Sequence, residues 1–320
     1  MVSIRPYQPA ADESAVVDMW QTTFASTWPL TRDMFRRVTV GADAYRDGDY
    51  VVAEERGAPI GFIATQTDRG DSPRRGGHIG LLLVAPDRRR QGIGRALHDA
   101  ALAHLRALGV NQVQLGGGDP YLWPGVPSTL SSALAFFHSC GWTYAETSYD
   151  LVQDLRGYVS PSALDRRVDG QRIALEIGAH QHAAEVLTFV AREFPSWEGS
   201  YRSVVELGDY ADLLLARGDD GHIIGTTIMY SPLSHPWRID VRWKTLLGED
   251  VGAISVVGVA ASARRRGVGH ALVARASEIV RERGARHCFI GWAWMIGLYG
   301  ELGYRVWQEY RMSRRELHSV

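Results

Sequence analysis

An arginine- and glycine-rich pattern that suits anion binding occurs twice in this sequence. Its copies are Arg89-Arg90-Gln91-Gly92-Ile93-Gly94-Arg95 and Arg264-Arg265-Arg266-Gly267-Val268-Gly269-His270. Each copy follows an apolar run and precedes a segment with helical spacing. Glycines let backbone N–H groups close around a phosphate, a helix start adds partial positive charge, and arginine pairs with further phosphate oxygens. We expect two phosphate-binding turns, although a strand-to-helix turn can need glycine for geometry alone.

Two other kinds of phosphate-binding loop do not fit this pattern. The P-loop requires Gly-Lys followed by Ser or Thr, which neither copy contains. The dinucleotide fingerprint requires Gly-x-Gly-x-x-Gly and an acidic residue about twenty positions later, and the glycine spacing here differs. These two kinds of pyrophosphate-binding loop can therefore be set aside.

The repeat extends beyond the two glycine turns. A shift of 175 positions carries Val84 to Val259 and Gly92 to Gly267, and a shift of 162 carries Phe137 to Tyr299. A Gly- and Pro-rich insertion at 116–127 accounts for the difference between the two shifts. Two copies are too few for a solenoid. We therefore expect two domains, 1–155 and 172–320, joined by a polar linker at 156–171.

The hydrophobic pattern predicts the same order of elements in both halves. In the first half, we expect strands at 2–5, 50–55, 60–67, 78–84, 112–115 and 142–155, and helices at 12–24, 92–108 and 131–140. Asp12 is a suitable N-cap for the first of these helices. Strands interleaved with helices predict α/β domains.

These motifs together resemble the GNAT superfamily of N-acetyltransferases. Its signature is a strand with Val, often Pro two residues later, and then Arg/Gln-x-x-Gly-x-Gly/Ala. The first half matches at Val84, Pro86, Arg89, Gly92 and Gly94, and the second at Val259, Arg264, Gly267 and Gly269, with Ala261 in the usual place of Pro. A late aromatic-x-x-x-Gly-aromatic motif recurs as Phe137-to-Trp142 and Tyr299-to-Tyr304.

The resemblance implies two tandem acyl-CoA N-acyltransferase domains that use acetyl-CoA as cosubstrate and need no metal. Each domain would have a mixed sheet that splays after its fourth strand. The pantetheine arm would lie in this wedge, beside Val84 in one half and Val257 and Val259 in the other. The pyrophosphate would bind to the turns 89–95 and 264–270. The reaction implied is direct attack of a primary amine on the acetyl thioester, with a backbone N–H near Val257–Val259 stabilising the oxyanion.

The family places a tyrosine that protonates the departing thiolate where Tyr299 lies. Phe137 occupies this place in the first half, so we expect the C-terminal half to carry the catalysis. A core aromatic is the alternative reading of Tyr299. Glu249 is our candidate for the catalytic base, because family members often place a carboxylate before the fourth strand, but a solvated loop acid fits equally well.

Several aromatic residues permit two interpretations. Tyr121 and Trp123, in the insertion, can cap a substrate pocket or pack against the neighbouring domain. Trp292 and Trp294 can form an aromatic wall for the acceptor or belong to the core, and the segment 234–237 can shape the same mouth. A non-catalytic acyl-CoA sensor is the alternative function, and Phe137 favours it.

Composition excludes several other classes. The sequence is 45% hydrophobic and 22% charged, as in globular proteins, and its 35 basic residues almost balance its 36 acidic ones. We therefore expect no nucleic-acid partner and no membrane partner, since no apolar run is long enough to span a bilayer. The start of the sequence lacks the regions of a signal peptide, which favours a cytoplasmic protein. A monomer acting on a small-molecule, peptide or protein amine is our expectation.

Overall fold

The computed structural model describes residues 1–39, 46, 48–68, 76–161 and 173–317. The chain divides into two compact units. Unit 1 comprises residues 1–148 and 308–320, and unit 2 comprises residues 149–307. Most of the expected linker, from residue 162 onward, lies outside the described residues.

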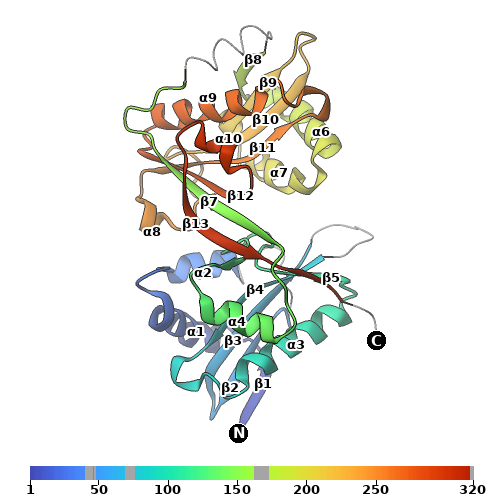
Figure 1. The fold of residues 1–320 in the computed structure, drawn as a ribbon, viewed down its shortest axis with the longest axis vertical. Coiled ribbons are helices and arrows are strands. Elements are labelled where there is room, and N and C mark those ends of the chain that lie inside the picture. The colour runs from blue at the N-terminus through green and yellow to red at the C-terminus, as the bar shows by residue number, and fades with distance from the viewer. Residues whose placement is uncertain (40–45, 47, 69–75, 162–172, 318–320) are drawn as a thin grey trace. The chain divides into compact units, whose positions relative to one another are not determined.

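Unit 1 contains a mixed sheet in the order β1-β2-β3-β4-β5-β14 (Figure 1). Its strands are β1 (Val2–Pro6), β2 (Tyr50–Glu55), β3 (Ala58–Thr67), β4 (Gly76–Val84), β5 (Gln112–Leu115), β6 (Val126–Pro127) and β14 (Arg314–Glu316). Its helices are α1 (Pro9–Phe24), α2 (Arg32–Val38), α3 (Ile93–Ala107) and α4 (Ser131–Ser139). Strands β4 and β5 are parallel, and the other pairs in this order are antiparallel.

Unit 2 repeats this plan, with strands pairing in the order β8-β9-β10-β11-β12-β7. The strands are β8 (Ala174–Ile177), β9 (Leu213–Arg217), β10 (Ile223–Tyr230), β11 (Val251–Val259), β12 (His287–Ala293) and β7 (Glu146–Asp154). The helices are α6 (Ala183–Glu193), α7 (Glu198–Glu206), α8 (Lys244–Leu247), α9 (Val268–Glu282) and α10 (Ile296–Gly300). The parallel pair is β11 with β12. The mixed sheets of the two units confirm the predicted α/β class.

In each unit, one strand of the parallel pair also pairs with a strand encoded in the other half of the sequence. Strand β7 follows unit 1 along the chain, yet it pairs with β12, where Leu151 faces Ile290. Strand β13 (Arg305–Met312) leads back to unit 1, and β14 then pairs with β5, where Arg314 faces Gln114. In Figure 1 the green β7 lies beside β12 and the red end of the chain runs beside β5. The expected domains, 1–155 and 172–320, instead assign β7 to the first domain and β14 to the second.

The helices form where the apolar spacing predicts them. Ile93, Leu97, Leu102 and Leu105 of α3 are all at most 4% exposed, which confirms this face as its buried side. Helix α1 instead begins at Pro9, three residues before the expected cap. The Asp12 carboxylate accepts the Gln8 N–H at 2.8 Å and pairs with Arg5, so it stabilises the first turn from within.

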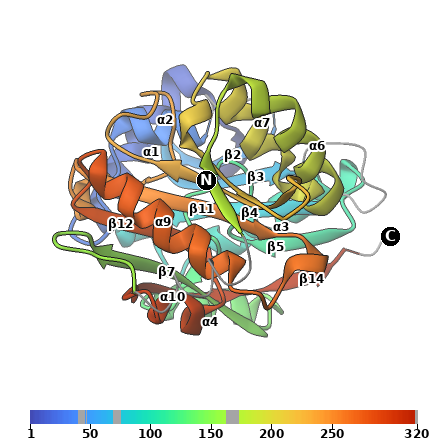
Figure 2. The same ribbon diagram turned by 90° about the horizontal axis from the view of Figure 1, so that it is seen from above.

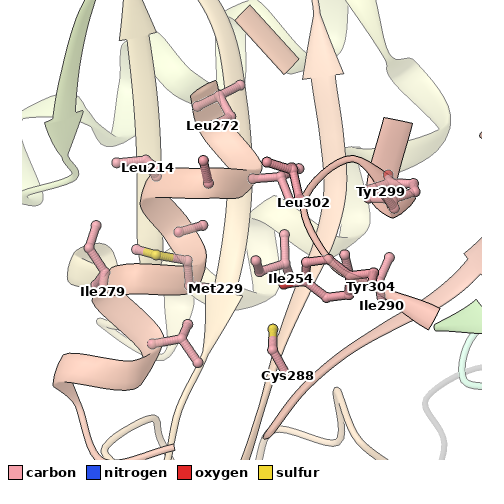
Figure 3. Packing of buried hydrophobic residues seen from close by; sticks show 14 of the residues in the cluster. Leu214, Met229, Ile254, Leu272, Ile279, Cys288, Ile290, Tyr299, Leu302 and Tyr304 are labelled. Atoms are coloured by element: carbon pink, nitrogen blue, oxygen red, sulfur yellow. The ribbon is translucent and has the colours of Figure 1, made fainter. Parts of the chain in front are cut away.

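The helices of unit 2 cover opposite faces of its sheet. Figure 2 shows α9 and α10 on one side of β11 and α6 and α7 on the other. The first side holds a core that includes Ile254, Leu272, Cys288 and Tyr304 (Figure 3). Cys288 is a buried side chain of this core, and its burial raises the pKa of the thiol to about 12. Among the helices described, none is long and apolar enough to cross a membrane.

Candidate active site

The two arginine–glycine turns have the same backbone conformation. Arg90 and Gly92 have φ of 63° and 82°, and Arg265 and Gly267 have φ of 61° and 81°. Positive φ at such positions turns successive N–H groups toward one side and forms an anion-binding concavity. Helices α3 and α9 start immediately after Gly92 and Gly267, which adds the N–H groups of their first turns.

The arginines that open the two turns also match. Arg89 Nε donates to the Val84 carbonyl oxygen at 3.1 Å, and Arg264 Nε donates to the Val259 carbonyl oxygen at 3.2 Å. Each arginine thereby ties its turn to the end of the preceding strand. The next side chains differ: Arg95 donates to the Ser139 carbonyl at 3.0 Å, whereas His270 lies 3.0 Å from Glu301.

The glycines of each turn have separate roles. A Cβ on Gly92 or Gly267 would meet nothing within 4 Å, so both glycines border open space. Glycine is favoured at both positions because their φ is positive. A Cβ on Gly94 would lie 3.3 Å from the Phe136 ring, and one on Gly269 would lie 3.7 Å from Val259. Gly94 therefore allows α3 to pack closely against Phe136, whereas Gly269 has room for a Cβ, and the first glycine of each turn leaves the turn open to a ligand. The turns fit a pyrophosphate group.

Each sheet splays just before its turn. The parallel pairing of β4 with β5 ends at Ile79 and Leu115, and that of β11 with β12 ends at Ala253 and Phe289. The rest of β4, to Val84, and the rest of β11, to Val259, have no such pairing with the parallel neighbour. The polar backbone along these segments can pair with an extended ligand, as an added strand would.

The pairing register shifts by one residue in both splayed strands, at Gly80 in β4 and at Val256–Val257 in β11, but the backbone conformation of the two bulges differs. Val256 has φ of 47°, which is strained for a β-branched residue. Strand β4, all of whose residues are described, holds no non-glycine residue at positive φ. The Tyr201 hydroxyl, from α7, donates to the Val256 carbonyl oxygen at 3.1 Å. Because the peptide is trans, the Val257 N–H points away from that carbonyl.

Tyr299 lies close to this strand. It is 7% exposed, and it packs in the core with Ile290 and Tyr304, as the close-up shows (Figure 3). Its neighbour Leu298 lies 3.9 Å from the Cβ position of Gly269, so α10 abuts the start of α9. Burial raises the pKa of the Tyr299 hydroxyl to about 12, which keeps its proton in place at neutral pH.

Glu249 is not brought together with these residues. It is exposed in the turn that precedes β11, at the end of the strand opposite the glycine turn. At about 3.3 Å per residue, the strand separates it from Val257 by about 25 Å. Its neighbour Asp250 pairs with Arg286 at 3.1 Å.

In unit 1 the insertion packs against its own unit. Trp123 is 6% exposed, and its ring centroid lies 5.2 Å from that of Trp20 and 5.4 Å from that of Trp28. Tyr121 instead lines a pocket with an empty volume of about 310 Å³, open solvent included, together with Gln66 and Gly80. Trp123 thus packs with aromatic residues of its own unit, which neither interpretation anticipated, whereas Tyr121 lies at a pocket.

The polar contacts at the bulge of β12 could not be predicted from the sequence. Trp292 has φ of 55°, and its backbone N–H donates to Asp150 Oδ1 at 3.0 Å. Asp150 comes from the exchanged strand β7, so linear spacing does not connect it with β12. The rings of Trp292 and Trp294 are 6.1 Å apart, and Trp294 is 50% exposed.

The model of the Acetyltransferase (GNAT) family matches two segments of this sequence, residues 14–122 and 181–304. These segments make up most of the chain and fall in the two halves of the repeat. The chain belongs to the Acetyltransferase (GNAT) family, in a tandem arrangement, and its class is that of the acetyltransferases. This confirms the family and the fold inferred from the motifs.

Curated proteins similar to this chain include two mycothiol acetyltransferases. The chain is 30% identical over 151 residues to a mycothiol acetyltransferase from Thermobispora bispora, and the match covers 44% of this chain and 46% of that protein. The corresponding protein of Amycolatopsis mediterranei is 32% identical over 154 residues, covering 46% and 48%. The matches therefore span about half the length of these curated relatives.

Solved structures match over nearly the whole chain. One is the GCN5-related glucosamine N-acetyltransferase region of a fungal multi-domain GH3 β-N-acetylglucosaminidase, with 33% identity and a TM-score of 0.92, covering 98% of this chain and 38% of that one. A tandem GNAT protein from the clavulanic acid biosynthesis pathway has 17% identity and a TM-score of 0.64, covering 99% and 98%. At that identity, the second likeness concerns the fold alone.

Proposed function

We propose that this protein transfers the acetyl group of acetyl-CoA to a primary amine by direct attack in a ternary complex, and that unit 2 carries the chemistry. The observation that carries this assignment is the oriented peptide at Val256. It sets the Val257 N–H away from α7, on the splayed part of β11. A pre-oriented donor of this kind stabilises the oxyanion that forms when an amine attacks a thioester.

Tyr299 supplies the second element of the mechanism. Acetyl-CoA provides an activated acyl group when its pyrophosphate lies on the turn 264–270 and its pantetheine lies along Val257–Val259. The Tyr299 hydroxyl then protonates the departing sulfur, and it is suited to this because it holds its proton at neutral pH. Phe137 preserves the ring in unit 1 but has no proton to give.

For the acceptor, we propose an amino sugar such as glucosamine. The solved structure with 33% identity over 98% of this chain is named for this activity. The residues after the β12 bulge suit such an acceptor, because the half-exposed Trp294 beside Trp292 offers an aromatic face on which the C–H groups of a sugar ring can stack.

In this proposal, unit 1 binds acyl-CoA at a second site but does not catalyse acetyl transfer. Its turn 89–95 keeps the conformation of the catalytic one, which favours binding. Phe137 and the unstrained β4 speak against catalysis there. This retains the sensor interpretation for one unit of the enzyme.

The test combines binding with product analysis. Acetyl-CoA is titrated calorimetrically into wild type, Gly92→Glu and Gly267→Glu, and each protein is then incubated with glucosamine. Released CoA is measured with a thiol reagent and N-acetylglucosamine by mass spectrometry. Each substitution places a carboxylate in one open turn, so the two variants are matched controls.

We expect Gly267→Glu to abolish product and Gly92→Glu to remove one binding event while product formation continues. Loss of product in Gly92→Glu alone would reverse the assignment of the units. A wild type that binds acetyl-CoA but acetylates other amines and not glucosamine would overturn the acceptor class only.

A further inference from the structure

Strand β7 brings a buried carboxylate into unit 2. Asp150 is 3% exposed and lies opposite the two bulged residues of β12, Gly291 and Trp292. Its Oδ1 accepts the Trp292 N–H at 3.0 Å and would lie 3.4 Å from a Cβ on Gly291. The carboxylate thus lies where β12 departs from regular pairing, a few residues beyond the point where it parts from β11.

The face on which Asp150 lies is fixed by its neighbours. Tyr149 and Leu151 pack in the core that contains Tyr299, whereas Val152 packs with Phe289 in a separate cluster. Since side chains alternate along a strand, Asp150 shares the face of Val152 and Phe289. Tyr299 and Asp150 therefore approach the splayed strands of unit 2 from opposite faces of the sheet.

The matching position of unit 1 holds no carboxylate. Gln114 faces Arg314 on β14, and Phe289, its counterpart at the shift of 175, faces Val152 on β7. Asp150 lies two residues before Val152. The residue two positions before Arg314 is Met312, so Met312 takes the place of Asp150 in unit 1. Beyond the end of β5, the Gly117 N–H of the insertion donates to the Trp123 carbonyl oxygen at 2.8 Å, so a backbone acceptor is used there.

We propose that Asp150 is the catalytic proton acceptor of unit 2, contributed by the strand exchanged from the first half of the sequence. This inference rests on the proposed function. The Asp150 carboxylate pairs with the acceptor ammonium and takes one proton from it, which frees the nitrogen lone pair. The C–N bond forms at the acetyl carbonyl carbon, and the C–S bond breaks as the adduct collapses.

The protons balance as follows. Nitrogen loses a second proton to solvent, Tyr299 gives one proton to the sulfur, and exchange with solvent restores Tyr299 and Asp150. The net products are the acetamide, CoA thiol and one proton. Tyr299, the proton donor, and Asp150, the proton acceptor, are kept apart because they lie on opposite faces of the sheet.

The experiment compares Asp150→Asn with Asp154→Asn. Asparagine at 150 keeps the oxygen that accepts the Trp292 N–H and removes only the charge. Asp154 is an exposed acid of the same strand, paired with Arg156, so it controls for charge loss on β7. The measurements are kcat and KM for glucosamine, the Kd for acetyl-CoA, and Tm.

We expect Asp150→Asn to lower kcat by about 100- to 10,000-fold with acetyl-CoA affinity and Tm unchanged. Asp154→Asn keeps wild-type kcat. In Asp150→Ala, added formate restores part of the rate, because a small carboxylate can occupy the vacated space.

Wild-type kcat in Asp150→Asn would overturn the proposal, since it would reduce Asp150 to a backbone acceptor. A loss in Asp150→Ala that formate leaves untouched, together with a lowered Tm in both variants, would overturn it in favour of a structural role. A wild type that acetylates no amine at all overturns the proposed function, which is a separate failure.

Discussion

The Tyr201 hydroxyl donates a hydrogen bond to the carbonyl oxygen of Val256 at 3.1 Å, and this bond fixes the one strained peptide of strand β11. Tyr201 is fully buried on α7, among apolar residues that include Val186 and Phe189. The helix therefore acts as a rigid support for the backbone of the strand. In unit 1, the fully buried aromatic residue of α2 is Phe35, which has no hydroxyl to offer.

Removing that hydroxyl should slow the reaction without weakening acetyl-CoA binding. We expect Tyr201→Phe to lower kcat by about 10-fold, a fraction of the loss seen when an oxyanion donor is removed outright. Steady-state kinetics and calorimetry measure the two effects. Tyr144→Phe is the matched control, because Tyr144 makes the same kind of bond to Leu134 in unit 1. Equal kcat values for both variants would contradict the role of Tyr201.

Tyr299→Phe should lower kcat by about 10- to 100-fold, because an acid–base group contributes in this range or above it. Acetyl-CoA affinity should persist, since the ring remains. Because the protonated hydroxyl is the active form and its pKa is about 12, activity should not fall on account of Tyr299 until the pH approaches 12. A wild-type alkaline limb near pH 9 that disappears in Tyr299→Phe would refute this.

The reciprocal variant is Phe137→Tyr. It places a hydroxyl on the ring of unit 1, which is 8% exposed beside Trp142 and His98. We expect no gain of activity in a Gly267→Glu background, because unit 1 also lacks the strained bulge and the counterpart of Asp150. Measurable product there would show that the tyrosine alone separates the two units.

The exchanged strands should make the halves interdependent. Residues 1–155 expressed alone leave the edge of β5 unpaired, and such an edge promotes association. We expect oligomers or aggregates by size-exclusion chromatography. Joining residues 308–317 to this fragment through a flexible linker restores β14 beside β5, and it should give a monomer with cooperative unfolding. A monomeric, cooperatively folded 1–155 would argue against the exchange.

Trp123→Ala should destabilise unit 1 by about 3–5 kcal/mol, the usual cost of removing a buried tryptophan. Hydrogen exchange in peptides from α1 and from residues 116–127 measures the change locally. Trp294→Ala is the control: its side chain is half exposed, and we expect a change of about 0.5 kcal/mol or less. Equal effects would mean that the insertion does not stabilise its unit.

The sequence predicted those features that depend on local spacing. The apolar face of α3, the turns at Gly92 and Gly267, and the difference between Phe137 and Tyr299 all follow from short motifs. The start of α1 did not follow, because Pro9 is favoured in a first helical turn and Asp12 acts from inside that turn.

The remaining features depend on tertiary structure. Nothing about valine predicts φ of 47° at Val256, since packing against α7 and the register of β10 impose it. Asp150 cannot be connected with Trp292 by reading along the chain, because 142 positions separate them. Glu249 was chosen because family members often place a carboxylate before the fourth strand, whereas the extended strand β11 separates it from Val257.

Strands β7 and β14 each pair with a strand encoded in the other half of the sequence. This exchange determines when each sheet can close during synthesis. Residues 1–148 are synthesised first and include β4, one neighbour of β5, but the second neighbour of β5 is available only after Arg314–Glu316 have left the ribosomal exit tunnel. The earliest part to be translated is therefore among the last to close. During translation it must keep an open sheet edge soluble for as long as it takes to make the intervening residues.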